Sequence, residues 1–379
     1  MEALERENTE ESYGTFKILD DESNALIYVF GQNSYGELGI GDLEEKHVPT
    51  KLSFFNNIEI SQIAAGNEHT AVLTKAGEVY TFGFNGSGQL GHGNTKSYHH
   101  PKLVEALVDH KIEFIASANG CEHLASVNTK GELFMCGYNN YGQLGNGSQV
   151  NETIPSMLPG FKEKSVFFVA WSYYHTIIIV NESENRAPLK DITKTSVYAV
   201  GRNDSGQLGL EHNNHEFYPK LIAPMFNKEV VKAACGLHHS VFLTRDGHIY
   251  SSGFNDNGQL GLGDKNHRNS PIIVNALENE KIVDVACGYY HTLARTDKGD
   301  IYSFGRNDKG QWGIEEIGSS YLFPIKIYEF EVPNSLANLF ISAADQFKSS
   351  SVKIGISNAP YLTANNSQSS SQIFASSCK

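Results

Sequence analysis

The chain has 379 residues, of which 40% are hydrophobic and 19% charged, a composition typical of a folded protein and not of a disordered one. Its formal net charge of −13 at pH 7 disfavours broad contact with nucleic acid or acidic membranes. No apolar run reaches the length of about 18 residues that a membrane span needs, and five scattered cysteines do not predict a disulfide scaffold.

Three segments follow one another along the chain. Residues 1–22 form an acidic leader with eight acidic and two basic side chains, which we expect to be disordered and which has no secretory signal. Residues 23–357 carry a repeat and are predicted to fold. Residues 358–379 are rich in Ser, Asn and Gln, and are predicted to be a disordered tail.

The repeat contains a nine-residue motif, Gly-x-Asn-x-x-Gly-(Gln/Glu)-(Leu/Trp)-Gly, which occurs at successive intervals of 52, 54, 64, 52 and 52 residues. The six copies begin at Gly31, Gly83, Gly137, Gly201, Gly253 and Gly305. Of the 35 glycines in the chain, 30 occupy positions set by the repeat. The glycine content therefore indicates a repeat architecture and not a flexible linker.

A second signature follows each motif after 38 to 43 residues: a small residue, two variable residues and a histidine. Its histidines are His69, His123, His175, His239 and His291, and the sixth copy is eroded to Asp345…Lys348-Ser349. Short apolar runs and glycine turns alternate between the two signatures, as in residues 240–247. A unit of about 52 residues with several short strands predicts a blade of an all-β propeller.

The ends of the repeat region suggest how the ring closes. The first unit begins, and the last one ends, part-way through a blade. We therefore expect the N-terminal strand to pair with the last C-terminal strands, which would close the ring and remove exposed sheet edges.

Together the two signatures, such as Gly253 to Gly261 followed by Ala286-Cys287-Gly288-Tyr289-Tyr290-His291-Thr292, resemble the regulator of chromosome condensation repeat. The resemblance covers roughly residues 25–356. It implies a β-propeller of four-stranded blades, usually seven. The spacing leaves no room for a hidden seventh unit, so we predict six blades. The alternative is a degenerate seventh blade built from residues 1–24 and 357–379.

In a repeat protein the variable positions carry function. The two residues before each signature histidine, here called the slot positions, are Asn67-Glu68, Cys121-Glu122, Tyr173-Tyr174, Leu237-His238, Tyr289-Tyr290 and Gln346-Phe347. In a plant photoreceptor of the resembling family these positions carry tryptophans, which are absent here, so light sensing by that mechanism is not expected. Exposed tyrosines suit protein recognition, and packing between blades is the alternative.

A second variable set directly follows the first glycine of each motif and is here called the anchor positions. They are Gln32, Phe84, Tyr138, Arg202, Phe254 and Arg306. Packing between blades is again the alternative. The predicted protein-binding residues are Arg202 and Arg306 of this set and, of the slot positions, Asn67, Glu68, Glu122, Tyr173, Tyr174, Leu237, His238, Tyr289 and Tyr290.

One insertion, residues 181–194, accounts for the 64-residue interval. The founding member of the resembling family uses a protruding hairpin wedge to release nucleotide from the Ran GTPase. That analogy makes Glu182, Arg186, Pro188 and Lys190 candidate wedge residues. A tolerated surface loop is the alternative.

The repeated histidines and the motif asparagines are predicted to be structural, each histidine through a hydrogen bond inside its own blade. Cys235 and Cys287 each precede a signature histidine by four residues, yet the equivalent positions hold Ala65, Asn119, Trp171 and Ala344, which argues against zinc. The chain also lacks a phosphate-binding loop, a His-Glu-x-x-His motif and a nucleophile elbow. We therefore expect no catalytic residue, no metal and no cofactor.

The main functional hypothesis is a monomeric, non-enzymatic scaffold that binds cytosolic protein partners through its loop faces. The first alternative is guanine-nucleotide exchange on a Ran-like small GTPase, which needs no covalent chemistry. The second is a partner subunit of the tRNA-wobble or diphthamide modification machinery. We expect no direct nucleic-acid or membrane binding, and a cytoplasmic location with the nucleus as the alternative.

Overall fold

The computed structural model of the chain describes residues 26–117, 122–162, 164–182, 194–312, 320–327, 351–357 and 372–378. Within these ranges the regular structure consists of β-strands and short 3₁₀ turns, with no α-helix. The predicted leader, residues 1–22, and the eroded sixth signature at Asp345 to Ser349 lie outside the described residues.

The strands form six four-stranded sheets, as the repeat predicted. Blade 1 combines both ends of the chain, in the order β2 (Lys46–Lys51), β1 (Leu26–Gly31), β24 (Gln372–Cys378), β23 (Ser351–Ser357). Blade 2 is β3 (Ile60–Ala65), β4 (His69–Thr74), β5 (Val79–Gly83), β6 (Tyr98–Leu103). Blade 3 is β7 (Ile112–Ala116), β8 (His123–Asn128), β9 (Leu133–Gly137), β10 (Glu152–Met157).

The remaining blades repeat this order. Blade 4 is β11 (Ser165–Trp171), β12 (His175–Asn181), β13 (Thr195–Gly201), β14 (Glu216–Leu221). Blade 5 is β15 (Val230–Cys235), β16 (His239–Thr244), β17 (Ile249–Gly253), β18 (Arg268–Ile273). Blade 6 is β19 (Ile282–Cys287), β20 (His291–Thr296), β21 (Ile301–Gly305), β22 (Tyr321–Ile327).

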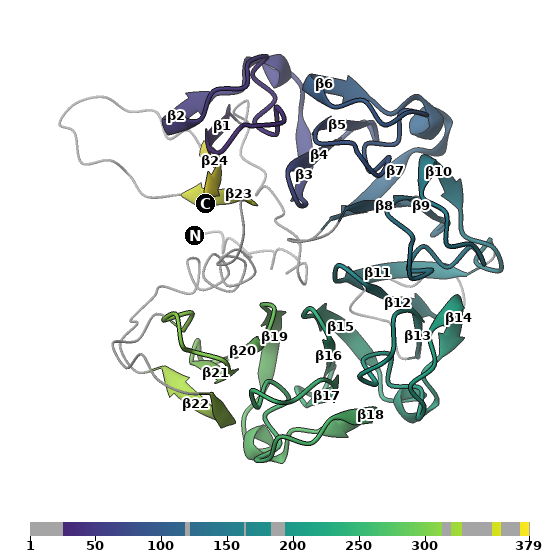
Figure 1. Ribbon diagram of the computed structural model, residues 1–379, viewed down its shortest axis with the longest axis vertical. Helices are drawn as coiled ribbons and strands as arrows, with labels where there is room; N and C mark the ends of the chain where they lie inside the picture. The colour runs from purple at the N-terminus through teal and green to yellow at the C-terminus, as the bar shows by residue number, and fades with distance from the viewer. Residues whose placement is uncertain are drawn as a thin grey trace, which may run out of the picture.

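Successive blades follow one another around a centre, with the first strand innermost in blades 2 to 6 and β23 innermost in blade 1 (Figure 1). The second strands are buried along their whole length in blades 2 to 5, because they lie in the middle of a sheet that is covered on both faces. Four short 3₁₀ turns close the outer corners, and each buries one apolar side chain against the sheets. They are η1 (Ser53–Phe55), η2 (Glu105–His110), η5 (Ala223–Met225) and η6 (Asn275–Leu277).

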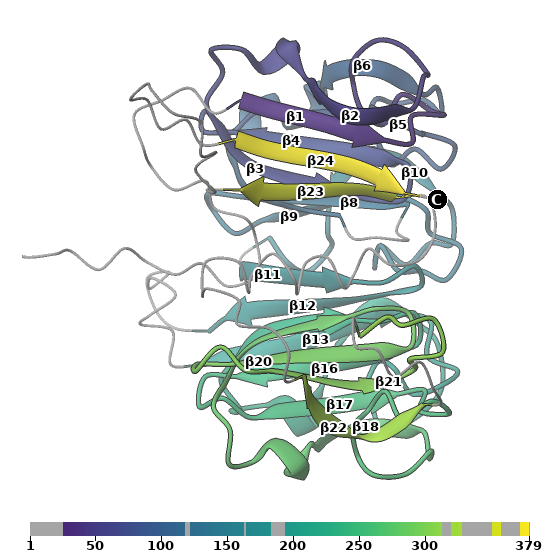
Figure 2. The same cartoon turned by 90° about the vertical axis from the view of Figure 1, so that its left-hand side faces the viewer.

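Closure of the ring joins the two ends of the chain, as expected. β1 pairs with β24 in parallel, Tyr28 opposite Phe374, whereas β23 and β24 are antiparallel (Figure 2). The expected tail, residues 358–379, therefore contains a strand of blade 1, and the propeller does not end at residue 357. The Ser- and Gln-rich composition of the whole tail conceals the short segment from Gln372 to Cys378, which includes Ile373 and Phe374.

The motif asparagine organises the loop that follows the third strand of each blade. In blade 5 the Asn255 Oδ1 accepts a hydrogen bond from the backbone N–H of Leu260 at 3.0 Å, and its Nδ2 donates to the carbonyl of Asp264 at 2.9 Å. The motif glutamine Gln259 accepts the N–H of Asn257 at 3.1 Å. Since equivalent bonds recur in the other blades, these side chains replace the backbone pairing that an irregular loop lacks.

Neighbouring blades interlock through the proline that recurs in each outer strand. A side chain at Gly91 would place its Cβ 2.9 Å from Pro155 Cγ, and Gly91 also has a φ of +75°. The same arrangement joins Gly145 to Pro219. The fixed spacing between motif and proline thus reflects a contact between consecutive blades, and only glycine leaves room for it.

Side chains near the middle of the inner strands also contact the inner strand of the neighbouring blade. Gln62 exchanges two hydrogen bonds with the backbone of Ile115 in the next blade. Phe114 and Phe168 lie 6.2 Å apart between blades 3 and 4. Lys232 and Asp284 form a buried ion pair between blades 5 and 6.

Candidate protein-interaction face

The slot and anchor positions, predicted as two separate sets, meet on one face of the propeller. In each of blades 2 to 6 the backbone N–H of the anchor residue donates to the carbonyl of the second slot residue, at 2.7 to 2.9 Å. The pairs are Phe84 to Glu68, Tyr138 to Glu122, Arg202 to Tyr174, Phe254 to His238 and Arg306 to Tyr290. We call the surface that carries them the anchor face.

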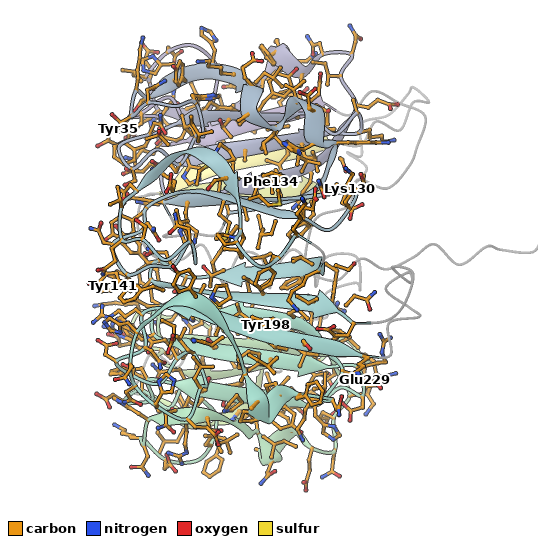
Figure 3. All side chains as sticks on the ribbon, turned by 90° about the vertical axis from the view of Figure 1, so that its right-hand side faces the viewer. Tyr35, Lys130, Phe134, Tyr141, Tyr198 and Glu229 are labelled. Carbon is orange, nitrogen blue, oxygen red and sulfur yellow. The ribbon has the colours of Figure 1, made fainter. Side chains whose placement is uncertain are left out.

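The opposite face carries the turns between the second and third strands, here called the hairpin face. Figure 3 shows Tyr35 and Tyr141 on one side of the molecule and Lys130 and Glu229 on the other. The insertion joins β12 to β13, as the turn at Lys130 joins β8 to β9, so it leaves from the hairpin face.

The base of the insertion and the slot residues are therefore on opposite faces. At the base of the insertion the exposed Glu182 donates its backbone N–H to the carbonyl of Lys194 at 3.0 Å. The other wedge residues, Arg186, Pro188 and Lys190, lie outside the described residues, as do Cys121, Gln346 and Phe347 of the slot positions.

A band of aromatic rings crosses the anchor face over blades 3 to 6. Tyr174 is stacked on the imidazole of His238, with ring centres 5.4 Å apart and an interplanar angle of 14°. Phe254 lies between His238, at 6.3 Å, and Tyr290, at 6.0 Å. Tyr173 contacts both Tyr174, at 4.8 Å, and Tyr138 of blade 3, at 5.6 Å. All of these side chains are half-buried, so they pack between blades and still reach the surface.

Two arginines extend the aromatic band. The guanidinium of Arg202 lies over Tyr174, 4.9 Å from the ring centre, and over Tyr141, at 5.1 Å. Arg306 lies 5.9 Å from the centre of Tyr290. Each arginine is held by the aspartate two residues later, and both ion pairs measure 2.5 Å. The guanidinium planes are thereby fixed against the rings.

His238 is neutral within this band. Burial, reinforced by the charge of Arg202, lowers the pKa of its imidazole to about 4. At physiological pH the ring therefore acts as an uncharged aromatic surface and not as a cation.

The other slot residues have narrower roles. Asn67 offers its backbone carbonyl to His69 Nδ1 at 3.1 Å. Leu237 donates its N–H to the carbonyl of Tyr289 in the next blade at 3.2 Å. All three slot side chains, those of Asn67, Leu237 and Tyr289, are half-buried on the anchor face.

Comparison with known proteins identifies the repeat. The model of the regulator of chromosome condensation (RCC1) repeat matches residues 24–73, 76–127, 130–179, 196–243 and 246–295, and a second RCC1-repeat model matches 60–89, 230–259 and 282–311. The chain belongs to the RCC1-repeat family. The interval between the third and fourth matches contains the insertion.

Two curated relatives carry the same repeats. The chain is 31% identical over 295 residues to the ultraviolet-B receptor UVR8 of Arabidopsis thaliana, which covers 78% of the chain and 64% of the receptor. It is 35% identical over 300 residues to the human E3 ubiquitin-protein ligase HERC2, covering 79% of the chain and 6% of the ligase. The chain thus matches less than two thirds of the length of either relative.

Among solved structures, human WBSCR16 has a TM-score of 0.67 at 20% identity, covering 82% of the chain and 83% of that protein. This similarity concerns the fold. It agrees with the all-β propeller described above.

The RCC1 repeats are offset from the blades. The first match, residues 24–73, runs from β1 in blade 1 to β4 in blade 2, so one sequence repeat spans a blade boundary. Each repeat therefore links two neighbouring sheets covalently as well as through packing.

The RCC1 histidines are buried, and some of their hydrogen bonds reach beyond the predicted single blade. The Nε2 of His175 in blade 4 contacts Ser240 Oγ of blade 5 at 2.8 Å, and that of His239 contacts Thr292 Oγ1 of blade 6 at 3.0 Å. These bonds join neighbouring blades. The Nδ1 atoms of His69 and His175 also make the predicted contacts inside their own blades, to the Asn67 carbonyl at 3.1 Å and to Ser172 Oγ at 2.7 Å. The hydroxyls of Ser240 and Thr292 in turn donate to motif-loop carbonyls of the preceding blade, each at 2.8 Å.

Burial keeps these imidazoles neutral. It lowers the pKa of His69 to about 4, and the pKa values of His123, His175 and His239 to about 3. Among the described residues no group of three or more His, Cys, Asp or Glu side chains could hold a metal ion. No helix in the described part of the chain has the length and apolar character of a membrane span.

Sequence reasoning missed two residues of the anchor face. Tyr141 occupies a variable position inside the motif, and no separate pattern marked it. Glu37 stands where most motif copies have glutamine, which was a visible signal. Its side chain is buried at 1% exposure, and burial raises the pKa of its carboxyl.

Proposed function

We propose that the protein is an interaction scaffold that binds a protein partner through its anchor face. The observation that carries this proposal is the band of Tyr174, Arg202, His238, Phe254 and Tyr290, whose rings and guanidinium contact one another across three blades. Tyrosine and arginine dominate the binding energy of many protein interfaces. These side chains are already ordered by mutual contact, so binding would immobilise few free rotamers.

The proposal can be tested by cross-linking from the band. A photoreactive phenylalanine analogue at Tyr290 should cross-link a partner in cell extract, which mass spectrometry would identify. With the purified partner, we expect Tyr290→Ala and Arg306→Ala to weaken binding about tenfold or more, since truncating an interface anchor costs roughly 1–2 kcal/mol.

A matched control lies on the hairpin face. Lys130 is exposed there, and Lys130→Ala should leave the affinity within about twofold. Equal losses for Lys130→Ala and Tyr290→Ala, or no loss for either anchor-face variant, would contradict the proposal.

Guanine-nucleotide exchange on a Ran-like small GTPase is the alternative. It rests on membership of the RCC1-repeat family and on the insertion at the hairpin face. Release of labelled GDP from a panel of purified small GTPases would test it. Stimulated release that is lost when residues 183–193 are replaced by a short Gly-Ser linker would favour exchange over a pure scaffold. The tRNA-wobble or diphthamide alternative has no specific support among the described contacts.

We further propose a cytoplasmic location and a monomeric state, with the nucleus as the alternative location. The net charge of −13 and the lack of a lysine or arginine run support the cytoplasm. Imaging of the tagged chain and light scattering of the purified protein would test both, and steady association with chromatin would contradict the first.

A further inference from the structure

Three glutamates from successive blades lie on the anchor face beside the aromatic band. Glu37 follows β1, Glu68 precedes β4, and Glu122 precedes β8. Burial and, after it, the charge of Glu122 raise the pKa of Glu68. Burial raises the pKa of Glu37, and the charge of Glu68 adds to that effect. A Cβ at Gly83 would lie 2.5 Å from the Glu68 carbonyl oxygen and 3.1 Å from the Glu37 Cα, so Glu37 and Glu68 are neighbours in space. The charge of Glu68 therefore acts on Glu37, and that of Glu122 on Glu68.

None of these three carboxylates has a Lys, Arg or His nitrogen within 4.0 Å among the described residues. Blades 4 and 6 differ, because Arg202 pairs with Asp204 and Arg306 with Asp308. At the anchor positions where those blades carry arginine, blades 2 and 3 carry Phe84 and Tyr138. Among the described residues, the negative charge on this half of the face is thus uncompensated.

Glu37 supplies an independent indication of a missing partner. Its Oε2 accepts the backbone N–H of Tyr35 at 2.8 Å, whereas the buried Oε1 accepts no hydrogen bond from any described group. A carboxylate oxygen at 1% exposure without a donor is costly, and a positive charge placed over Glu68 would reduce that cost.

Aromatic rings flank the glutamates. Phe84, which pairs with Glu68 through the backbone, lies edge-on to Tyr35 with ring centres 4.8 Å apart. Beside Glu122, the Tyr173 hydroxyl donates to Oε1 at 3.1 Å and Ser87 Oγ donates to Oε2 at 2.7 Å. Glu122 is therefore held in one position, with tyrosine rings next to it.

We propose that Glu68 and Glu122, together with Phe84, Tyr138 and Tyr173, form an acidic–aromatic patch that binds a lysine or arginine side chain in a basic segment of the protein partner, and that the buried carboxyl of Glu37 adds negative charge to it. A carboxylate attracts an ammonium or guanidinium group, and the neighbouring ring faces add cation–π attraction. This inference rests on the proposed function: the aromatic band supplies apolar contact, and the patch selects a partner with positive charge beside that contact.

The test uses the full chain and a defined probe. A fluorescein-labelled peptide carries three arginines separated by glycine and serine, and its twin carries neutral citrulline at the same three positions. Fluorescence anisotropy should show that the arginine peptide binds and that its affinity falls as the salt concentration rises. The affinity for the citrulline peptide should be lower by at least about tenfold.

Two variants and one control locate the site. Glu122→Gln and Glu68→Gln should each weaken the arginine peptide about tenfold, since a charge-assisted hydrogen bond contributes roughly 1.5–3 kcal/mol. Glu132 lies in the same blade as Glu122 but at the β8–β9 turn, and Glu132→Gln removes the same charge from the hairpin face. It should leave binding within about twofold. Thermal unfolding of each variant confirms that the fold is kept, and the side chain of Glu68 makes no hydrogen bond to a described residue whose loss could disturb the fold.

Several results would overturn the patch. Equal weakening by Glu132→Gln and Glu122→Gln would show attraction to net charge alone, and equal affinity for the citrulline peptide would show that charge is not recognised. Light scattering that shows a dimer dissociated by Glu122→Gln would assign the patch to a second copy of the chain. The peptide assay does not need the partner. If the arginine peptide does not bind while Tyr290→Ala still weakens the affinity for the purified partner, the patch is overturned and the proposed function stands. If the arginine peptide binds as expected but Tyr290→Ala leaves the affinity for the partner unchanged, the proposed function is overturned and the patch stands.

Discussion

Asp284 should be the most sensitive charged residue at the centre of the propeller. It lies on the inner strand of blade 6, where its Oδ1 pairs with Lys232 of blade 5 and accepts the backbone N–H of Val285 at 2.9 Å. Its Oδ2 lies 3.9 Å from the guanidinium of Arg295. The side chains of Asp284 and Lys232 are only 13% and 9% exposed, so little water is available to replace a lost partner.

The two ends of this ion pair are not equivalent. Asp284→Asn leaves two cations, Lys232 and Arg295, without their carboxylate, and we expect it to cost about 3–5 kcal/mol of unfolding free energy. Lys232→Met leaves Asp284 with Arg295 and the Val285 N–H, and replaces a buried ammonium by an apolar chain of similar length. We expect it to cost only about 1–2 kcal/mol. The double variant Lys232→Met/Asp284→Leu should regain only part of the loss, because Arg295 still lacks its carboxylate partner.

Urea unfolding followed by tryptophan fluorescence and by circular dichroism measures these differences, provided that the two probes coincide. Asp284→Asn should remain the more destabilising variant at high salt, because a buried pair is poorly screened. The reasoning is refuted if Lys232→Met costs as much as Asp284→Asn, or if the double variant is less stable than both single variants.

Three further results are expected. Burial lowers the pKa of His175 and His239 to about 3, below the unfolded value near 6.5, so unfolding takes up protons. Thermal stability should therefore be complete above about pH 6.5 and fall towards pH 4, and His239→Gln should reduce that slope. Gly253→Ala should cost several kcal/mol because its Cβ would lie 2.4 Å from the His238 carbonyl, whereas Gly160→Ala, with open space around it, should cost about 1 kcal/mol in urea unfolding. Affinity for the arginine peptide should rise with pH through the raised pKa of Glu68, and a flat profile between pH 4 and 7 would contradict a role for that carboxylate.

Much of the fold could be predicted because each repeated position has the same structural role in every blade. The motif asparagine Asn255 needs its amide to satisfy a loop, and the glycine Gly91 must leave room for Pro155. Because the same requirements recur in every blade, the same residue types recur at a regular spacing in the sequence. Strand β24 could not be predicted in the same way, because it pairs in parallel with β1 from the other end of the chain and carries no motif.

The candidate site was only partly predictable. The slot and anchor positions were visible as variable residues beside fixed ones, but the sequence did not show that Arg202 would lie over Tyr174, or that Tyr173 would donate to Glu122 of another blade. The histidine bonds were assigned to single blades because sequence spacing shows a period without showing which neighbour each side chain faces. His239 reaches Thr292 in the next blade, 53 residues away.

The way that slot and anchor residues meet explains how this face can change without loss of the fold. Tyr174 and Arg202 join through a backbone N–H and a carbonyl at 2.9 Å, and Glu68 and Phe84 join in the same way at 2.7 Å. The glycine before each anchor residue lets the slot carbonyl approach closely, so the contact involves backbone atoms and does not depend on the side chain of either residue. An acidic–aromatic pair in blade 2 and an aromatic–cationic pair in blade 4 therefore stand on the same main-chain geometry. Because the side chains are not needed for that contact, they can differ in chemistry from blade to blade without loss of the fold.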